Sequence, residues 1–290
     1  MKIKILIPIY NDWQSLNKIL GNINLEISNL KHDFSVLIVN DASTENMPEL
    51  FTSLDNFSSI KLIHMKENKG HARCNASGLK YIYENEQFDY VIPMDGDGED
   101  RPEEIKLLVD KMENNPEKVI VGERIKRSES IFFKLCYSFH KILTYTFTGQ
   151  SIKFGNYTCL TKSTIEKMLS DKATWSSFSG SLAKNCNDRA AIASERGKRY
   201  FGPSKMSFLN LIKHSLAIIG VFKFNVLIRS ILFILVYFFL IYQKISLIMF
   251  IPLILVVIFL VSTFIISKRE NLDQLENSLE NILKIDKINL

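Results

Sequence analysis

Glycine and proline are scarce in this chain, with 12 and 7 of them among 290 residues. So few exclude a collagen-like chain and a chain made mainly of flexible linkers. The 4 cysteines lie far apart and form no Cys-x-x-Cys pair, so we expect reduced core cysteines rather than a zinc site. Basic residues outnumber acidic ones by only 36 to 31, without an arginine-rich tract, so no nucleic-acid partner is expected.

The N-terminus also lacks a secretory signal. Its opening apolar run, residues 3–9, is too short for a signal-peptide core and has no small-residue cleavage site after it. Such a run is typical of a buried first strand. We therefore expect the N-terminal domain to stay in the cytoplasm.

Two long apolar runs near the C-terminus hold much of the hydrophobicity of a chain that is 47% hydrophobic. The first, 225–242, has one charge, Arg229, near its start, and the second, 245–266, has none. Each is close to the roughly 20 residues needed to cross a bilayer. The short break between them predicts a membrane hairpin, and the basic residues on its flanks favour cytoplasmic ends.

Helical patterns flank the hairpin on both sides. Residues 206–224 repeat apolar positions at three and four with basic residues between them, which favours a helix in the membrane interface over one packed on the domain. Residues 267–290 place apolar residues on one helical face, so we expect a cytoplasmic helix that packs on the domain or on a second subunit of a homo-oligomer. The predicted domains are 1–205, 206–224, 225–266 and 267–290.

Residues 1–125 alternate short apolar runs with amphipathic stretches. The predicted strands are 3–9, 34–39, 60–63, 90–94 and 119–121, and the predicted helices are 13–29, 70–85 and 102–114. Beyond them we expect a helix at 131–146, a strand at 157–161 and a loop or weak helix at 171–189. The alternation indicates an α/β fold with a mostly parallel sheet and helices on both faces. Ligands bind beyond the carboxyl ends of such strands, so the polar residues there are the first candidates for chemistry.

The strand predicted at 90–94 ends abruptly in carboxylates. Asp95 and Asp97 follow it, separated by a glycine that lets the backbone turn tightly. Grouped hard oxygen ligands suit Mg²⁺ or Mn²⁺ shared with a diphosphate, and such an ion neutralises the charge that builds on a departing phosphate. An EF-hand loop is excluded because the twelfth position, counted from Asp95, is Lys106.

Six segments match the motifs of one known family in order and spacing. Residues 7–12 (IPIYND) match P-x-Y-N-[DE], 39–45 (VNDASTE) match V-D-D-G-S-T-D, and 68–75 (NKGHARCN) match N-x-G…A-R-N. Residues 94–103 (MDGDGEDRPE) match M-D-A-D-x-Q-D-x-P-E, 121–127 (VGERIKR) match G-x-R-x-x-R, and 199–205 (RYFGPSK) match R-x-x-G-x-S-K. Together they resemble the family 2 glycosyltransferases, in the branch that includes dolichyl-phosphate mannosyltransferases and bactoprenyl glucosyltransferases.

This resemblance implies a GT-A fold and an inverting transfer of sugar from a nucleotide sugar, with Mg²⁺ or Mn²⁺ as cofactor. It assigns donor binding to Pro8, Tyr10, Asp12, Asp41, Arg73 and Lys205. The implied catalytic residues are Asp95, Asp97, Arg124, Arg127 and Arg199, of which the arginines meet phosphates through their planar fork. The implied metal ligands are Asp95, Asp97 and Glu99.

Several of these residues have a structural alternative. In that alternative Tyr10 caps the sheet and Asp41 forms an Asx turn. Arg127 is then a solvated loop charge, and Lys205 anchors the chain to a membrane surface. Among the histidines, His71 lies nearest the implied pocket, and we expect no direct role for it.

Four positions depart from the pattern of the branch. Asn40 replaces an Asp, which alters the expected contacts with the base, and Glu99 replaces a Gln, which adds negative charge at the metal. Asn156 and Thr158 stand where the branch often has Asp and Arg. The loss of that arginine weakens a phosphate contact, so these changes bear on the acceptor more than on the donor.

The implied acceptor is a polyprenyl phosphate, used for surface glycan synthesis or modification. A hydroxyl acceptor needs a general base, whereas a phosphate monoester is mostly dianionic at neutral pH. Residues 171–189 offer Asp171 and Asp188 but no acidic pair, which favours the phosphate. The alternative is transfer to a hydroxyl of a membrane-linked saccharide or lipid, and a third hypothesis is a membrane-anchored protein that binds nucleotide sugars with little catalysis. We expect a multi-pass inner-membrane protein with its catalytic domain and both termini in the cytoplasm.

Overall fold

The computed structural model describes residues 1–48, 54–126, 131–203, 207–243 and 245–288. The chain divides into two compact units. The first combines Met1–Ser128, Lys153–Lys205 and Asn271–Leu290, and the second combines Glu129–Ile152 with Met206–Glu270. The predicted domain 1–205 is thus interrupted: residues 129–152 belong with the apolar segments, and the last 20 residues return to the first unit.

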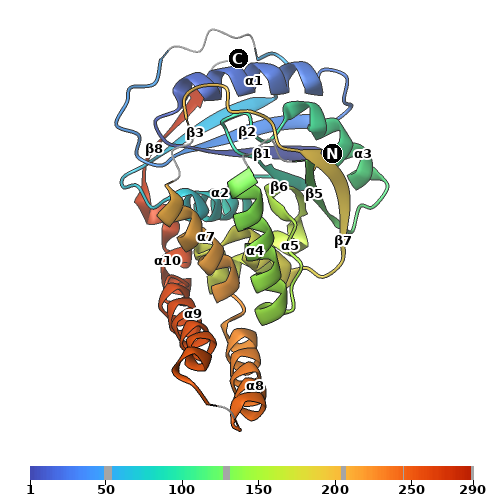
Figure 1. The fold of residues 1–290 in the computed structure, drawn as a ribbon. Helices are drawn as coiled ribbons and strands as arrows, with labels where there is room; N and C mark the ends of the chain where they lie inside the picture. Colours follow the sequence, from blue (N-terminus) through green and yellow to red (C-terminus); the bar gives the residue numbers. More distant parts are fainter. Residues whose placement is uncertain (49–53, 127–130, 204–206, 244, 289–290) are drawn as a thin grey trace. The chain divides into compact units, whose positions relative to one another are not determined.

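Among the described residues, an eight-stranded sheet forms the centre of the first unit (Figure 1). Its strands are β1 (Lys2–Ile9), β2 (Asp33–Asn40), β3 (Ser59–Met65), β4 (Tyr90–Pro93), β5 (Val119–Lys126), β6 (Phe154–Thr161), β7 (Arg189–Glu195) and β8 (Ile282–Ile288). They lie in the order β7-β5-β6-β4-β1-β2-β3-β8. β1 pairs in parallel with β2 and β4, β2 with β3, and β5 with β7, whereas β6 and β8 run antiparallel to their neighbours. The predicted mostly parallel sheet is confirmed.

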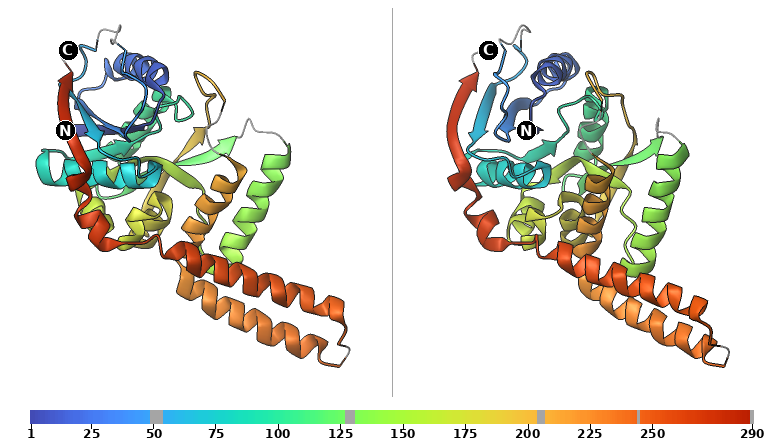
Figure 2. Two further views of the ribbon diagram at one scale, coloured as in Figure 1. Left: turned by 90° about the vertical axis from the view of Figure 1, so that its left-hand side faces the viewer. Right: turned by 60° about the vertical axis from the view of Figure 1, so that its left-hand side comes forward.

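Helices cover both faces of this sheet, as Figure 2 shows for α1 and α2. The helices of the first unit are α1 (Trp13–Ile27), α2 (His71–Asn85), α3 (Ile105–Glu113), α5 (Lys162–Leu169), α6 (Phe178–Asn185) and α10 (Leu272–Glu276). Short 3-10 turns occur at Pro102–Glu104, Lys172–Trp175 and Ser278–Asn281. The predicted helices at 13–29, 70–85 and 102–114 are confirmed, and the region 171–189, expected to be weakly structured, contains a short turn and α6.

Alternation along β1 fixes which helix packs on which face. Ile5 belongs to a buried cluster with Leu16 of α1 and Leu108 of α3. Its neighbour Leu6 points the other way, toward α2. A Cβ added at Gly78 of α2 would lie 2.4 Å from Leu6 Cδ1, so glycine is what allows this close approach. Because β1 is buried on both faces, its carboxyl end and the residues that follow it are held in a fixed position.

The C-terminus differs most from the prediction. The helix expected over 267–290 is wrong, because only α10 forms and the chain then continues as β8. β8 pairs with the outer edge of β3, from Ile60 opposite Ile288 to Met65 opposite Ile282. An open strand edge offers a ladder of backbone hydrogen bonds, and this tertiary partner outweighs local helical spacing. β7, at 189–195, was likewise not predicted.

The second unit is helical. It contains α4 (Ile131–Thr148), α7 (Phe208–Gly220), α8 (Lys223–Ile241), the 3-10 turn Leu247–Phe250 and α9 (Ile251–Ser267). A small buried cluster joins Phe147, Ile219, Val226 and Val256, one from each helix. Arg229, the one charge in the first apolar run, donates from Nη1 to the carbonyl oxygen of Thr146 at 2.9 Å, near the end of α4. A cation at a helix C-terminus is favourable, so this charge has a structural partner.

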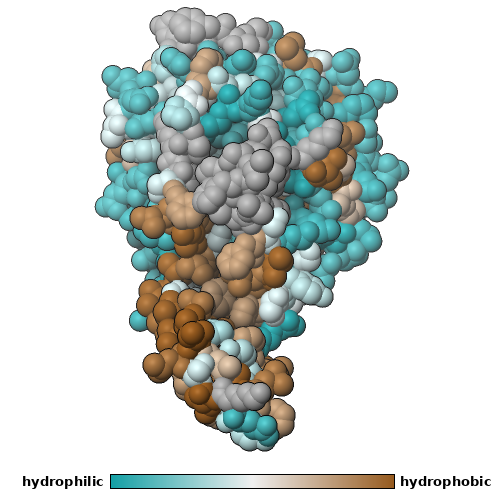
Figure 3. All heavy atoms as spheres, in the orientation of Figure 1, coloured by the Kyte–Doolittle hydropathy of each residue, from teal (hydrophilic) through white to brown (hydrophobic). Residues whose placement is uncertain are grey.

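Two segments are long and apolar enough to cross a membrane, and the second extends past residue 270, where this unit ends. The segment Lys223–Ile241 has a mean hydropathy of 2.4, and Leu247–Glu276 has 3.0. Most of their side chains are exposed rather than buried in the protein, and Figure 3 shows apolar surface over α7, α8 and α9. A soluble protein would bury such helices, so these features describe a membrane protein and support the predicted hairpin.

Candidate active site

The carboxyl end of β4 runs into a loop of four carboxylates, residues 95–100, called the acidic loop below. The backbone N–H of Asp95 donates to Asp100 Oδ2 at 2.9 Å, and that of Glu99 donates to Asp97 Oδ1 at 2.9 Å. Gly98 has φ of +89°, a left-handed conformation that suits glycine. Two carboxylates thus fold the loop on itself, and the loop then enters the turn before α3.

The His71 and Asn156 side chains meet Asp95. His71, the first residue of α2, places Nε2 at 2.9 Å from Asp95 Oδ1, and Asn156 of β6 donates from Nδ2 to the same oxygen at 3.3 Å. His71 thus contacts the acidic loop, while the expectation that it has no direct role in the chemistry stays a prediction. The signal for this contact was available in the sequence, because His71 directly follows the Asn-x-Gly motif.

A strap formed by residues 195–201 lies across the acidic loop. Its backbone N–H groups at Gly197 and Tyr200 donate to the carbonyl oxygens of Glu99, at 2.8 Å, and Asp97, at 2.9 Å. The Tyr200 ring rests on Gly98, where an added Cβ would lie 2.6 Å from the ring. Its hydroxyl accepts a hydrogen bond from Asn22 Nδ2 at 2.9 Å, which ties the strap to α1. Backbone and ring contacts together hold the strap in place.

Two arginines of the strap pair with the loop. Arg199 contacts Asp97 Oδ2 through Nη1 at 2.5 Å and Asp12 Oδ2 through Nη2 at 2.5 Å. Arg196 forms an ion pair with Glu99. Sequence reasoning missed Arg196, although the run from 195 to 199 holds three basic residues. The paired residues lie 97, 102 and 187 positions apart, and no local sequence pattern predicts pairing over such separations.

Crowding of these carboxylates shifts their pKa values. Burial, together with the charge of Asp95, raises the pKa of Asp97 to about 6 and that of Asp100 to about 7. Burial acts in the same direction on Asp95, but the charge and hydrogen bond of His71 outweigh it, so the pKa of Asp95 falls well below its usual range. Of these carboxylates, Asp95 holds its charge over the widest pH range, and the site favours added positive charge.

The Asp41 carboxylate accepts hydrogen bonds from the backbone beside the site. Its Oδ1 accepts from the N–H of Lys69 and its Oδ2 from the N–H of Gly70, both at 2.8 Å. Asn68 Nδ2 donates to the Asp41 carbonyl oxygen at 3.1 Å. Burial raises the pKa of Asp41, and the two N–H groups act against that rise. The carboxylate therefore fixes the turn that begins α2.

The loops after β1 and β2 are tied together. Asn11, with φ of +49°, accepts at Oδ1 from the N–H groups of Thr44, at 2.8 Å, and Glu45, at 3.1 Å. Pro8 is buried in β1 opposite Val39 of β2. Tyr10 is 42% exposed, so its ring is accessible to a ligand above the sheet.

The remaining predicted arginines lie in different places. Arg124 of β5 reaches the acidic loop, with Nη2 at 3.8 Å from Asp100 Oδ1. Arg73 instead lies over the ring of Trp175, 5.6 Å from its centroid, and donates to the carbonyl oxygen of Lys69. Arg127 and Lys205 fall outside the described residues. The structure thus brings together Asp12, Asp95, Asp97, Glu99, Arg124 and Arg199, but not Arg73.

A divalent cation fits this donor set in its chemistry. Asp95 and Asp97 supply hard carboxylate oxygens, and the guanidinium between Asp12 and Asp97 shows that a cation is accommodated there. Over the described ranges, however, no group of three or more His, Cys, Asp or Glu side chains is arranged to hold an ion. An ion bound here would need further oxygens from its ligand.

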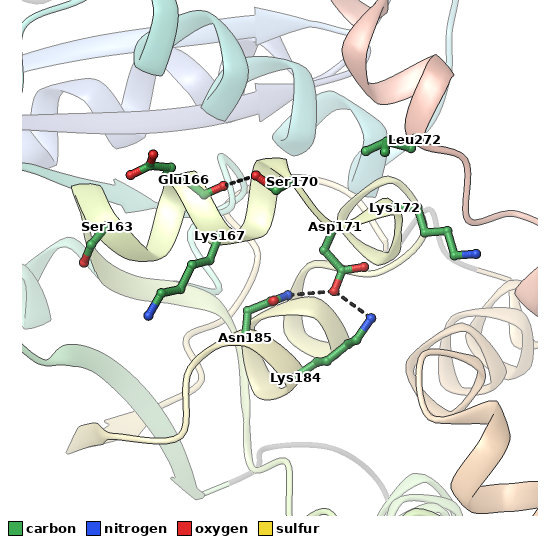
Figure 4. Close-up of a pocket in the computed structure, with 9 residues that line it drawn as sticks. All are labelled: Ser163, Glu166, Lys167, Ser170, Asp171, Lys172, Lys184, Asn185 and Leu272. Carbon is green, nitrogen blue, oxygen red and sulfur yellow. Dashed lines mark hydrogen bonds and ion pairs between the residues drawn. The ribbon is translucent and has the colours of Figure 1, made fainter.

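A separate hollow of about 740 Å³ lies between α5, α6 and the start of α10 (Figure 4). Asp171 lies in it, and accepts from Lys184 Nζ at 2.7 Å, from Asn185 Nδ2 at 2.9 Å and from the N–H of Ala173 at 3.0 Å. Burial would raise the pKa of Asp171, but these donors outweigh it and the pKa is lowered. A carboxylate held in this way is a poor general base.

Comparisons with known proteins agree with this geometry. Residues 4–170 match the family model described as glycosyl transferase family 2. The undecaprenyl-phosphate 4-deoxy-4-formamido-L-arabinose transferase of Yersinia enterocolitica is 28% identical over 218 residues, which are 73% of this chain and 64% of that protein. The protein of the same name from Klebsiella pneumoniae is 27% identical over the same shares. The chain therefore spans about two-thirds of the length of these relatives.

Solved structures resemble the fold. S. aureus TarS 1–349 in complex with UDP-GlcNAc aligns with a TM-score of 0.53 and 14% identity, over 97% of this chain and 89% of that one. The mannosyltransferase PcManGT of Pyrobaculum calidifontis, in complex with GDP-Man and Mn²⁺, aligns with a TM-score of 0.52 and 14% identity, over 96% and 74%. At this identity the likeness concerns the fold alone, and it confirms the GT-A architecture.

Proposed function

The chain belongs to glycosyl transferase family 2, and on that premise we propose that it is a membrane-bound enzyme that moves a sugar from a nucleotide diphosphate sugar to a polyprenyl phosphate. One observation carries the proposal. The acidic loop after β4 is faced by Arg124, Arg196 and Arg199, so places for a cation and for phosphates lie side by side. The names of the curated relatives, which are undecaprenyl-phosphate transferases, support a lipid phosphate as acceptor.

We place the donor above the carboxyl ends of β1, β2 and β4. Asp95 and Asp97 would hold Mg²⁺ or Mn²⁺, with oxygens of the diphosphate as further ligands. When bound, the ion neutralises charge on the departing diphosphate. Pro8, Tyr10 and Asp12 would line the nucleotide side, while Asp41 shapes the turn beneath it. Glu99, paired with Arg196, is the least available of the predicted metal ligands.

The acceptor site is assigned to the arginines. A phosphate monoester carries most of its second negative charge at neutral pH and needs no general base, since its second pKa is about 6. Arg124 and Arg199 suit it because a guanidinium fork binds phosphate in two places. In the stretch 171–189, Asp171 is held by three donors and Asp188 pairs with Lys118 at 2.8 Å, which disfavours a hydroxyl acceptor. Roles for Arg127 and Lys205 stay predictions.

In this scheme the phosphate oxygen attacks the anomeric carbon from the face opposite the nucleotide. The nucleoside diphosphate leaves with the bonding electron pair, and the anomeric configuration inverts. The protein orients both phosphates and screens their mutual repulsion. It does not need to move a proton, which agrees with a site that has arginines but lacks an unpaired carboxylate pair among its described residues.

A lipid acceptor requires the enzyme to work at a membrane. We propose that α8 and α9 cross the inner membrane and that α7 lies in its interface. α7 exposes Phe208, Leu209 and Ile212, which are 49%, 68% and 41% accessible. An apolar face of this kind on a helix beside two spans is typical of an interfacial segment. The basic residues on the flanks of the spans favour a cytoplasmic catalytic unit.

The test is a lipid-extraction assay on the full chain in detergent. The protein receives Mn²⁺ or Mg²⁺, a polyprenyl phosphate and, in turn, a panel of labelled nucleotide sugars. We expect acid-labile label in the organic phase, because glycosyl phosphates hydrolyse easily. Asp97→Ala should lower transfer by roughly 100-fold or more, as expected for loss of charge stabilisation at a leaving group.

Two outcomes would oppose the proposal. Label that reaches the organic phase equally with Asp97→Ala would remove the acidic loop from the reaction. Transfer that begins only when a saccharide acceptor is added, and gives an acid-stable product, would establish the hydroxyl acceptor instead.

A further inference from the structure

Arg199 occupies the position at which the proposed site would take a cation. Its guanidinium bridges Asp12 and Asp97, with both contacts at 2.5 Å. The side chains are only 16%, 20% and 16% exposed for Arg199, Asp12 and Asp97, so water screens the pairs weakly. The interaction is therefore stronger than an ordinary surface salt bridge.

Both carboxylate oxygens of Asp97 already have a partner. Its Oδ1 accepts from the N–H of Glu99, and its Oδ2 meets Arg199. The Glu99 contact belongs to the backbone of the loop and persists as long as the loop keeps its shape. An ion that binds Asp97 therefore competes with Arg199, because two cations cannot share one carboxylate oxygen at close range without repulsion.

We infer that Arg199 acts as an internal counter-ion which donor binding displaces from Asp97 and which then binds the acceptor phosphate, so that donor and ion bind before the acceptor. The inference rests on the proposed function. Within the described residues, Arg199 Nε is buried and has no hydrogen-bond partner. Release of Nη1 would give the guanidinium two unpaired donors, as a phosphate requires.

The strap allows this exchange without opening. Its backbone bonds from Gly197 and Tyr200, the Tyr200 ring on Gly98, and the Arg196–Glu99 pair do not involve Arg199. The change is thus one of side-chain rotation on a fixed support. Glu99 stands where the resembling branch has a Gln and so adds a negative charge to the loop. The ion pair with Arg196 neutralises that charge.

The first test measures Mn²⁺ binding in the presence of a nucleoside diphosphate, which supplies the further oxygens, by electron paramagnetic resonance of the full chain in detergent. Arg199→Gln should bind Mn²⁺ roughly tenfold more tightly than the natural protein, because a charged hydrogen-bonded competitor is removed. Arg199→Lys should fall between them, since lysine keeps the charge but not the fork. Lys198→Gln, a charge change on an exposed neighbour in the same strap, should stay within about twofold.

An unchanged or weaker Mn²⁺ affinity in Arg199→Gln overturns the inference, as does an absence of Mn²⁺ binding in both proteins. Circular dichroism confirms that each variant is folded, and Arg199→Lys carries the test if the glutamine variant is not.

The second test measures binding of a soluble short-chain prenyl phosphate, with and without Mn²⁺ and a nucleoside diphosphate. The natural protein should bind it at least about fivefold more tightly when both are present, and Arg199→Gln should lose this dependence. If the affinity for the prenyl phosphate does not depend on Mn²⁺ and nucleotide, the inference is overturned, but the proposed function is not. If no prenyl phosphate binds under any condition, the proposed acceptor itself is wrong.

Discussion

At the residue scale, each carboxylate of the site has a different partner and hence a different task. Asp95 meets a histidine, Asp97 an arginine, and Asp100 a backbone N–H of its own loop. Asp41 holds two N–H groups outside the loop. Identical chemical groups thus divide into those that can accept an added cation and those that hold the backbone in shape.

Asp41 offers a test of the second role. Asp41→Ala leaves two backbone N–H groups without their acceptor, and the free energy of unfolding should fall by about 2–4 kcal/mol at this buried position. Asp41→Asn keeps one acceptor oxygen and should lose less. Thermal unfolding of the two variants in the same detergent gives the comparison. Equal melting temperatures for the natural protein and Asp41→Ala would show that the turn does not depend on this carboxylate.

The residues found by sequence reasoning at this scale were those with a local signature. Asp95 and Asp97 follow a buried strand, and a short apolar run with alternating acids is readable from the chain alone. Arg199 was placed near phosphates, which is compatible with its position in the site. Its bridge to Asp12, 187 residues away, could not be read, because long-range pairing depends on how the whole sheet closes.

At the scale of the elements, one partly buried charge cluster links three parts of the first unit. Glu86, just after α2, contacts Lys4 of β1 at 3.0 Å and forms an ion pair with Lys61 of β3. Burial would raise the pKa of Glu86, but the hydrogen bonds from Lys61 and Lys4 outweigh it and lower the pKa below its ordinary value of 4.5. The cluster therefore ties a helix end to two strands.

This cluster predicts a pH dependence of stability. Because the folded-state pKa of Glu86 is lower than the unfolded one, its contribution is present above about pH 4.5 and disappears as the pH falls through the folded-state value. Glu86→Gln should be less stable than the natural protein at pH 7, and its stability should fall less between pH 5 and pH 3. Melting temperatures across that range check this. Parallel curves for the two proteins would assign the acid sensitivity to other groups.

Helices and strands with a clear apolar periodicity in their own sequence were predictable. Those whose conformation depends on pairing with a distant element were not. The strand at 3–9 and the helix at 70–85 carry clear apolar spacing. β8 was mistaken for part of a helix because its first residues, Ile282 and Leu283, continue the helical face of Leu272, Leu275 and Leu279. What decides between helix and strand is the open edge of β3, 217 residues earlier at the pairing of Met65 with Ile282.

At the scale of the whole molecule, the chain leaves its sheet unit twice. Residues 129–152 and 206–270 form one helical unit, and the last 20 residues return to pair with β3. A boundary at 205 was a natural expectation from composition, because hydrophobicity rises there. The helix predicted at 131–146 forms as α4, but that boundary assigned it to the catalytic domain, because its partners, such as Val226, lie far along the chain.

The return of the chain predicts a membrane topology. A cysteine placed at Gln243, in the turn after α8, should react with a membrane-impermeant maleimide added to intact cells, and one at Lys287, in β8, should react only after lysis. Both variants are made in a chain whose four native cysteines are replaced. Labelling of Lys287→Cys from outside, with Gln243→Cys protected, would reverse the orientation.

The most direct measurement of the proposed reaction is the phosphorus spectrum of the lipid recovered after reaction with each nucleotide sugar. We predict that the phosphomonoester signal of the polyprenyl phosphate is replaced by that of a phosphodiester carrying the sugar in inverted anomeric configuration. Asp97→Ala should leave the monoester unchanged. A monoester that persists in the natural protein while the nucleotide sugar is consumed and the sugar appears on a hydroxyl would contradict a lipid phosphate acceptor.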